Sequence, residues 1–270
     1  MNFDKKVCVV TGAANGIGRA ILEEFLKSGA HAAFSDVDVE AGKKLVNKWG
    51  NDKLLFVAGD LTQEEHLNQF TQAIKNRFSH VDYLINNAGI GGRGILSDIS
   101  YNDFNYLLKL KITAPYMLSK LLLDSFATGG VIINIASTRA FMSQPDTESY
   151  SAANGGMCAL THALSISLAG KVRVNSISPG WIDTGAYQKD EYYQPKHSQA
   201  DIAQHPAGRI GTPLDIAKMV LFLCSETGSF ITGENIIIDG GMSKQMIYNG
   251  DYGWNFNFKQ NITQEVSSEK

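Results

Sequence analysis

The chain has 270 residues, 44% of them hydrophobic, and a formal net charge of −3 at pH 7. This composition is sufficient for a sizeable core, and the scattered charges leave no basic stripe for nucleic acid and no polybasic patch for anionic lipid. No apolar run is long enough to span a bilayer, and the first residues lead into a strand without the apolar region of a signal peptide. We expect a cytoplasmic protein without nucleic-acid or membrane partners.

Three cysteines, Cys8, Cys158 and Cys224, lie far apart in predicted strands or helices. They show neither C-x-x-C spacing nor a mixed cysteine and histidine pattern, which are the usual signs of a metal site or a redox pair. We interpret them as buried thiols, and we expect no metal centre.

The first predicted unit consists of a strand, a glycine-rich turn and a helix. An apolar run over residues 6–10 precedes the sequence T-G-A-A-N-G-I-G at residues 11–18, and apolar residues then recur at helical spacing. This succession begins a dinucleotide-binding βαβ unit, because glycines allow the backbone to approach a pyrophosphate and the helix start favours its charge. Glycines also serve turns that bind nothing, so the turn alone is a weak signal.

The second predicted strand, residues 31–35, ends at Asp36. A carboxylate in this place accepts hydrogen bonds from an adenosine ribose and repels a 2′-phosphate, which favours NAD over NADP. Asp36 has an alternative role as a helix cap, which Asp38 is equally able to supply. A helix over residues 39–49 and a third strand over 54–57 follow, and Thr62-x-x-Glu65 predicts a capping box at the start of the next helix.

The remaining elements continue the alternation of strand and helix. Strands are expected at residues 81–85, 131–136, 172–177 and within 231–241, and helices at 101–123, 157–169 and from residue 213. This pattern predicts an α/β fold with a single domain over residues 1–270, built on a Rossmann-like, doubly wound parallel sheet with helices on both faces.

Two segments fall outside this regular pattern. Irregular residues 185–211 are predicted to form a substrate lid, because so long a loop inside a compact fold is usually functional or mobile. Residues 244–270 form a C-terminal extension that is too aromatic for an ordinary solvated tail. We expect the extension to pack on a neighbouring subunit, near an active-site mouth, or back on its own chain.

Groups able to do chemistry concentrate between residues 135 and 154. Ser137 follows a buried strand at its carboxyl end, where open α/β sheets bind ligands, and Tyr150 and Asn154 share one face of a helix. Serine, tyrosine thirteen residues on and a polar residue four later resemble the catalytic motif of the short-chain dehydrogenase/reductase family. Asn86-Asn87-Ala88-Gly89 and Pro179-Gly180 extend the resemblance, which covers roughly residues 5–243.

The resemblance implies a nicotinamide cofactor. It implies that Asp60 meets the adenine amino group and that Thr184 meets the nicotinamide amide. Ala13, Ala14 and Val37 stand where NADP-using members carry a cation, which again favours NAD. The predicted cofactor-binding residues are Gly12, Asn15, Gly16, Ile17, Gly18, Asp36, Asp60, Leu61, Asn87, Ala88, Gly89, Tyr150, Asn154, Pro179, Gly180, Ile182 and Thr184.

Two positions depart from the family pattern. Asn154 stands where the family has lysine, and Lys111 stands where it has its fourth catalytic residue, an asparagine. This reciprocal exchange indicates one displaced ammonium group. In the family the helices that carry these positions form the subunit interface, so the resemblance also implies a homotetramer or homodimer.

The family's catalytic roles define what the displaced cation must do. Tyrosine exchanges a proton with the substrate oxygen, serine positions that oxygen, and lysine lowers the pKa of the phenol and holds the nicotinamide ribose. Lowering a phenol pKa from about 10 to about 7 requires roughly 4 kcal/mol, which a cation about 4 Å away supplies at an effective dielectric near 20. An amide supplies no charge.

We therefore predict four catalytic residues. Tyr150 is the acid/base, Ser137 orients the substrate oxygen, Lys111 provides the cation and Asn154 binds the ribose or a water. The alternative for Lys111 is a solvated surface lysine, like Lys109 two positions away.

Two functions compete. The first is an NAD-dependent oxidoreductase that moves hydride between nicotinamide and a small-molecule secondary alcohol or ketone; the second is an NAD(H)-binding sensor or scaffold whose catalysis is impaired. The intact serine, tyrosine and Pro-Gly positions favour the enzyme. Acyl transfer by Ser137 lacks a nucleophile elbow and a histidine partner. Steroid-like, alicyclic and sugar substrates all fit the predicted pocket residues Phe141, Met142, Gln144, Trp181 and Tyr187.

Overall fold

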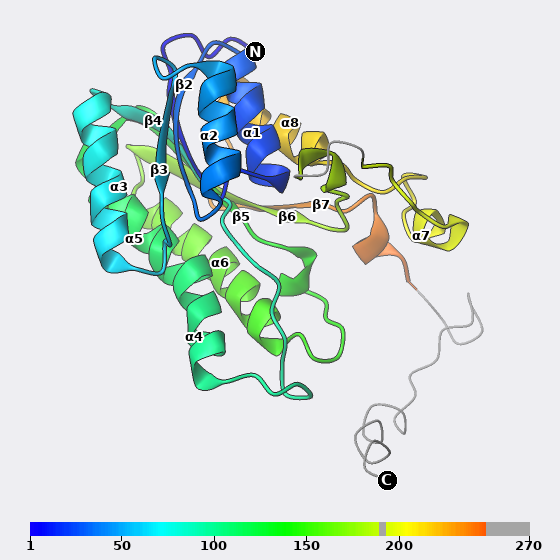
Figure 1. Ribbon diagram of the computed structural model, residues 1–270. Coiled ribbons are helices and arrows are strands. Elements are labelled where there is room, and N and C mark those ends of the chain that lie inside the picture. Colours follow the sequence, from blue (N-terminus) through cyan, green and yellow to red (C-terminus); the bar gives the residue numbers. More distant parts are fainter. Residues whose placement is uncertain (189–192, 247–270) are drawn as a thin grey trace.

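The computed structural model describes residues 1–188 and 193–246. These residues build a seven-stranded sheet in which every paired strand is parallel, in the order β3-β2-β1-β4-β5-β6-β7. The predicted α/β, doubly wound sheet is confirmed (Figure 1). The strands are β1 (Val7–Thr11), β2 (His31–Asp36), β3 (Leu54–Ala58), β4 (Val81–Asn86), β5 (Phe126–Ile135), β6 (Val172–Pro179) and β7 (Asn235–Ile238).

Helices cover both faces of the sheet (Figure 1). One face carries α1 (Gly16–Lys27), α2 (Val39–Trp49) and α8 (Pro213–Cys224), and the other carries α3 (Glu64–Arg77), α4 (Tyr101–Leu108), α5 (Ala114–Leu121) and α6 (Glu148–Ser167). Each layer has its own apolar core, and the sheet lies between the two cores. The short α7 (Gln199–Ala203) lies beyond the sheet.

The central strands read as nearly continuous apolar runs because they are covered on both faces. All residues of β1 and β4 are buried, which is the pattern of parallel strands between two helical layers. From β1 the chain continues to β2 on one side, whereas β4 leads to β5 on the other, so the strand order reverses between them. A crevice at such a point is where open α/β sheets bind ligands.

The predicted helix over residues 101–123 is interrupted. Between α4 and α5 the chain forms a π-helical turn, Lys109–Thr113, in which the Ala114 N–H donates to the carbonyl of Lys109. Pro115 explains the interruption, because proline has no N–H and its ring clashes with the carbonyl four residues earlier, here that of Lys111. Widening the turn by one residue relieves that clash, and such π-turns are frequent at functional sites.

The predicted capping box at Thr62 is wrong. Helix α3 begins at Glu64, with Gln63 as the N-cap residue and no side-chain cap. The Thr62 N–H donates instead to Asp60 Oδ1 at 2.9 Å. Thr62 therefore belongs to the turn that Asp60 organises, and the helix starts later than the sequence pattern indicates.

Two further expectations, on the cysteines and on membrane spans, have structural outcomes. Cys8 and Cys224 are buried, Cys158 is half-buried, and all three are free thiols. Within residues 1–188 and 193–246, no helix combines the length and the apolar character needed to cross a membrane. Residues 189–192 of the predicted lid and residues 247–270 of the predicted extension lie outside the described residues.

Candidate active site

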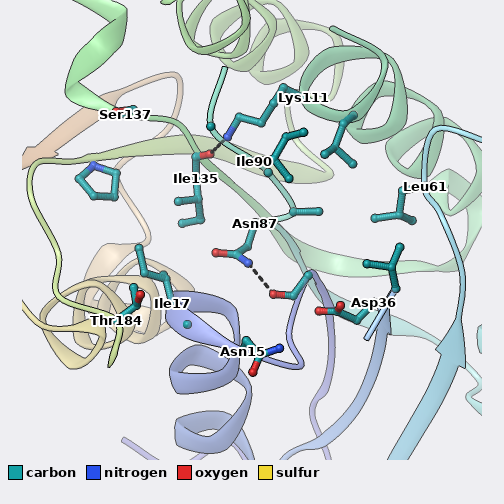
Figure 2. Close-up of a pocket in the computed structure, with 18 of the residues that line it drawn as sticks. Asn15, Ile17, Asp36, Leu61, Asn87, Ile90, Lys111, Ile135, Ser137 and Thr184 are labelled. Carbon is teal, nitrogen blue, oxygen red and sulfur yellow. Dashed lines mark hydrogen bonds between the residues drawn. The ribbon is translucent and has the colours of Figure 1, made fainter. Parts of the chain in front are cut away.

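A cavity of about 620 Å³ opens at the carboxyl ends of β1 and β4. Its walls bring together the ends of six strands, β1 to β6, and Asp36 and Leu61 lie toward one end while Ser137 and Thr184 lie toward the other (Figure 2). The lining includes the following predicted residues: Gly12, Asn15, Gly16, Ile17, Asp36, Asp60, Leu61, Asn87, Ala88, Gly89, Lys111, Ser137, Tyr150, Pro179, Gly180, Ile182 and Thr184.

The glycine turn after β1 is shaped by close backbone contacts. Gly12 has a φ of +64°, and a Cβ there would lie 2.8 Å from the Ala88 Cα. Gly18 does not line the cavity, because it packs beneath the turn, where a Cβ would lie 2.2 Å from the Gly12 carbonyl oxygen. Asn87 Nδ2 ties the turn to β4 by donating to the carbonyls of Thr11 and Gly12 at 3.0 and 2.9 Å (Figure 2).

The carboxylate of Asp36 is fixed by two backbone donors. Its Oδ2 accepts from the Ala14 N–H and its Oδ1 from the Asp38 N–H, both at 2.9 Å. The helix-cap role falls to Asp38, whose side chain accepts from Ala41 at the start of α2. Asp36 is thus held at the cavity wall instead of capping α2.

Ser137 and Tyr150 line the cavity from the two ends of the segment that joins β5 to α6. Ser137 follows β5, is 9% exposed, and its Oγ accepts from the Arg139 N–H at 3.2 Å. Tyr150 lies in the first turn of α6, and both residues line the cavity. The serine hydroxyl and the phenol are therefore presented to the same space.

Lys111 reaches the same cavity from the π-turn. It is 3% exposed, whereas Lys109 is exposed, so the two lysines do lie on different faces and the alternative of a surface lysine is wrong. Its Nζ donates to the Ile135 carbonyl at 2.6 Å (Figure 2), and its stem lies against Gly89, where a Cβ would be 3.1 Å from Lys111 Cδ. Burial lowers the pKa of Lys111 to about 8.

The Lys111 ammonium has no acidic partner in the part of the chain that the structure describes. Its hydrogen bond goes to a neutral carbonyl, and burial raises the pKa of the nearby Cys158 side chain, which keeps that group a neutral thiol. Among the described residues that line the cavity, Lys111 is also the one lysine or arginine. A buried cation without a counter-charge is unfavourable unless a ligand or a reacting group supplies one.

Asn154 is not brought to the cavity. It is fully buried on α6, its Nδ2 donates to the Tyr150 carbonyl at 2.8 Å, and its Oδ1 has no hydrogen-bond partner among the described residues. Asn154 and Tyr150 share a helix face, as predicted. The Asn154 side chain is too short to reach the cavity, whereas the longer lysine that the family has at this position would extend further. The structure places Asn154 behind Tyr150 and not at the surface of the cavity.

The predicted substrate residues lie outside the cavity lining. Phe141, Met142 and Trp181 are 59%, 39% and 40% exposed. Gln144 is exposed and bonds to Arg139. Tyr187 packs against the core beside α1, with the Arg19 guanidinium 5.9 Å from its ring centroid.

Sequence reasoning missed ten lining residues. Most are direct neighbours of a predicted residue, so extending each motif by one position would have found them. Tyr106 on α4 is different, since no motif marks it and only the packing of α4 brings it to the cavity. The ten are Ser35, Val37, Gly59, Ile90, Gly91, Tyr106, Leu110, Ile135, Ala136 and Gln188.

The cavity has the form required by a dinucleotide. Glycines 12 and 16 have positive φ and leave open backbone at the start of α1, where a pyrophosphate is favoured by helix N–H groups. The lining extends from the Asp36 carboxylate to Ser137 and Tyr150. Together with the strand order, these features define a Rossmann-type nucleotide-binding protein.

Comparison with known proteins identifies the family. Residues 12–243 match the protein-family model described as "Enoyl-(Acyl carrier protein) reductase". An "Uncharacterized oxidoreductase" of Thermotoga maritima is 41% identical over 254 residues, which cover 91% of this chain and 99% of that protein. The "3-oxoacyl-[acyl-carrier-protein] reductase FabG" of Vibrio cholerae is 33% identical, over 90% of this chain and 99% of its own length.

Solved structures support the same family assignment. An apo SCOR enzyme from Clostridium thermocellum has a TM-score of 0.84 and 44% identity, over 94% of this chain and 98% of that chain. Two structures at 29% identity and a TM-score of 0.80, over 90% of this chain and 100% of theirs, are a blue fluorescent protein from a metagenomic library with NADPH and a Brucella melitensis 3-ketoacyl-(acyl-carrier-protein) reductase with NADH. The chain belongs to the short-chain dehydrogenase/reductase family of oxidoreductases, which use a nicotinamide cofactor.

Proposed function

We propose that this chain is an NAD-dependent oxidoreductase that interconverts a small-molecule secondary alcohol and its ketone, with Tyr150 as acid/base and Lys111 as its cation. The observation that carries the proposal is the buried, uncompensated ammonium of Lys111 in the same cavity as Ser137 and Tyr150. A phenolate on Tyr150 is the counter-charge that this cavity lacks.

The preference for NAD rests on charge at the adenosine end. Asp36 presents a carboxylate held by two backbone N–H groups, and no lysine or arginine among the described lining residues lies near it to receive a 2′-phosphate. One solved relative contains NADPH and another contains NADH, so the relatives do not indicate which cofactor this chain prefers. The preference is therefore argued from the residues of this chain. A carboxylate facing a phosphate dianion disfavours NADP by repulsion.

The residues divide the proton chemistry among them. A nicotinamide held in this cavity would supply the hydride exchange with the alcohol or ketone carbon. Tyr150 takes the hydroxyl proton during oxidation and gives it back during reduction. The Ser137 Oγ, fixed by the Arg139 N–H, hydrogen-bonds to the substrate oxygen and holds it toward the phenol.

Lys111 supplies the electrostatic part. Its ammonium favours the phenolate that forms when Tyr150 has lost its proton, and the Ile135 carbonyl holds that ammonium in place by accepting its hydrogen bond. The cation is present only while Lys111 is protonated, and burial lowers the pKa of Lys111 to about 8. Asn154 carries no charge and packs behind Tyr150, so we assign it to the support of that turn of α6.

The test is NADH formation by the purified protein with a panel of secondary alcohols and sugars across pH. Wild type is compared with Lys111→Ala and with Lys109→Ala, an exposed lysine two positions away. Turnover by wild type and by Lys109→Ala, with loss near neutral pH in Lys111→Ala, supports the proposal. Unchanged activity in Lys111→Ala refutes it.

A second function follows from the Asn154 departure and is an outcome of the same assay. A wild type that binds NADH but converts no substrate, together with an Asn154→Lys variant that does, assigns the chain to a cofactor-binding sensor or scaffold. The variant is informative because Asn154 makes few hydrogen bonds of its own: its Nδ2 donates to the Tyr150 carbonyl, and its Oδ1 has no hydrogen-bond partner among the described residues. A lysine at this position has a longer side chain that would extend further than the amide does.

The proposed assembly is a homotetramer or homodimer through α4, α5 and α6. These helices carry the exposed apolar residues Tyr101, Tyr116 and Ile166, at 84%, 45% and 78% exposure. Light scattering of the full chain measures the mass, and a monomer would refute this part. The lid at residues 185–211 stays a prediction.

A further inference from the structure

His66 is a buried imidazole directly beneath the adenosine end of the cavity. It lies on α3, is 7% exposed, and its Nε2 shares a hydrogen bond of 2.7 Å with the Ser35 Oγ. Ser35 lines the cavity and precedes Asp36 on β2. The imidazole thus contacts the strand end that carries the predicted ribose ligand.

The second contact of His66 is with the chain that follows β3. Gly59 lies so close to the ring that a Cβ would be 2.2 Å from His66 Nδ1. The Gly59 N–H also donates to the Asp36 carbonyl at 3.0 Å, and both Gly59 and Asp60 line the cavity. His66 therefore braces the ends of β2 and β3 at the point where both reach the ligand space.

The charges around His66 come mainly from one group. Burial lowers the pKa of the imidazole, and the Asp60 carboxylate opposes this effect. Ser35 on β2 is neutral, Asp36 is the next residue along that strand, and on α3 the Phe70 ring stacks on the imidazole at 6.3 Å. From α4, the Tyr106 phenol lies near Asp60, and burial together with the charge of Asp60 raises the pKa of the phenol. A proton on His66 would place a cation below Asp60 and draw that carboxylate away from the cavity.

We propose that His66 is a positioning residue for the adenosine half of the cofactor, neutral when the cofactor is bound and weakening that binding when it gains a proton. This inference rests on the proposed cofactor. The inference requires that the protein binds NADH, but not that it converts a substrate. The proposed reaction is therefore tested by turnover, and the role of His66 is tested by NADH binding. Linkage makes the effect reciprocal, since bound NADH opposes protonation of His66.

The experiment is NADH titration by fluorescence between pH 5.5 and pH 7.5, with the full-length protein. Wild type should bind NADH more weakly at pH 5.5 than at pH 7.5, because bound NADH and the proton on His66 oppose each other. His66→Gln keeps a hydrogen-bonding group toward Ser35 and cannot gain a proton. Its affinity for NADH should therefore not change between pH 5.5 and pH 7.5.

Two controls separate positioning from folding. His80→Gln removes another histidine, which pairs with Asp82 at the amino end of β4 and should keep the wild-type pH dependence. Circular dichroism checks the fold of each variant. A His66→Gln protein with the wild-type loss of affinity at low pH, or a wild type without such a loss, overturns the inference. Absence of NADH binding by wild type at every pH overturns it together with the proposed cofactor.

Discussion

Replacing Lys111 by methionine should make the protein more stable and much less active. Burial lowers the Lys111 pKa from 10.5 to about 8, so holding the ammonium in the fold at neutral pH costs about 3 kcal/mol. Methionine fills similar space without the charge, but it loses the hydrogen bond to the Ile135 carbonyl, worth about 2 kcal/mol for a charged donor. The net gain is about 1 kcal/mol, or about 2 °C in Tm for a chain of this size.

The pH dependence gives the sharper test. The lysine binds its proton more weakly in the folded state than in the unfolded state, so its penalty is complete below about pH 8 and fades as pH rises toward 10.5. Urea denaturation should therefore show Lys111→Met to be the more stable protein at pH 7, with the advantage shrinking or vanishing by pH 10. Lys109→Met, at an exposed position, should show no such trend.

The same variant should lose activity. If the cation supplies about 4 kcal/mol to the phenolate, kcat near pH 7 should fall about a thousandfold. A Lys111→Met protein that is less stable than wild type at pH 7, or one with unchanged kcat, would contradict the assignment of a buried ammonium with a catalytic purpose.

Three further outcomes are expected. Gly18→Ala should destabilise the fold by about 1–3 kcal/mol and weaken NADH binding, because its Cβ would meet the Gly12 carbonyl. Gly155→Ala, whose Cβ would have nothing within 4 Å, should stabilise α6 slightly. Urea denaturation measures the stability of both variants, and NADH titration measures their binding. Asp36→Ser should raise the ratio of NADPH to NADH affinity by removing the repelling carboxylate, and an unchanged ratio would count against its role. The rate of alcohol oxidation should decline above about pH 8 as Lys111 loses its proton, and a rate that climbs steadily to pH 10 would show that the ammonium is not needed.

The order of elements could be predicted from the sequence because local rules decide it. Buried parallel strands read as short apolar runs, and helices between them repeat at another period, so α2 appears at residues 39–49 as predicted. The glycine turn, Asp36, Ser137 and Tyr150 each follow or adjoin a strand end, and parallel strands bring such ends to one edge. Most of the cavity lining follows from that rule alone.

Only the tertiary structure decided how the two exchanged residues are used. The sequence placed a lysine at position 111 and an asparagine at 154, but whether each reaches the cavity depends on helix rotation and side-chain length. Pro115 widens the helix at Lys109–Thr113, and the lysine stem then runs past Gly89 to the Ile135 carbonyl, while the shorter Asn154 remains buried behind Tyr150. These contacts join residues far apart in the chain, and no local pattern of the sequence encodes them.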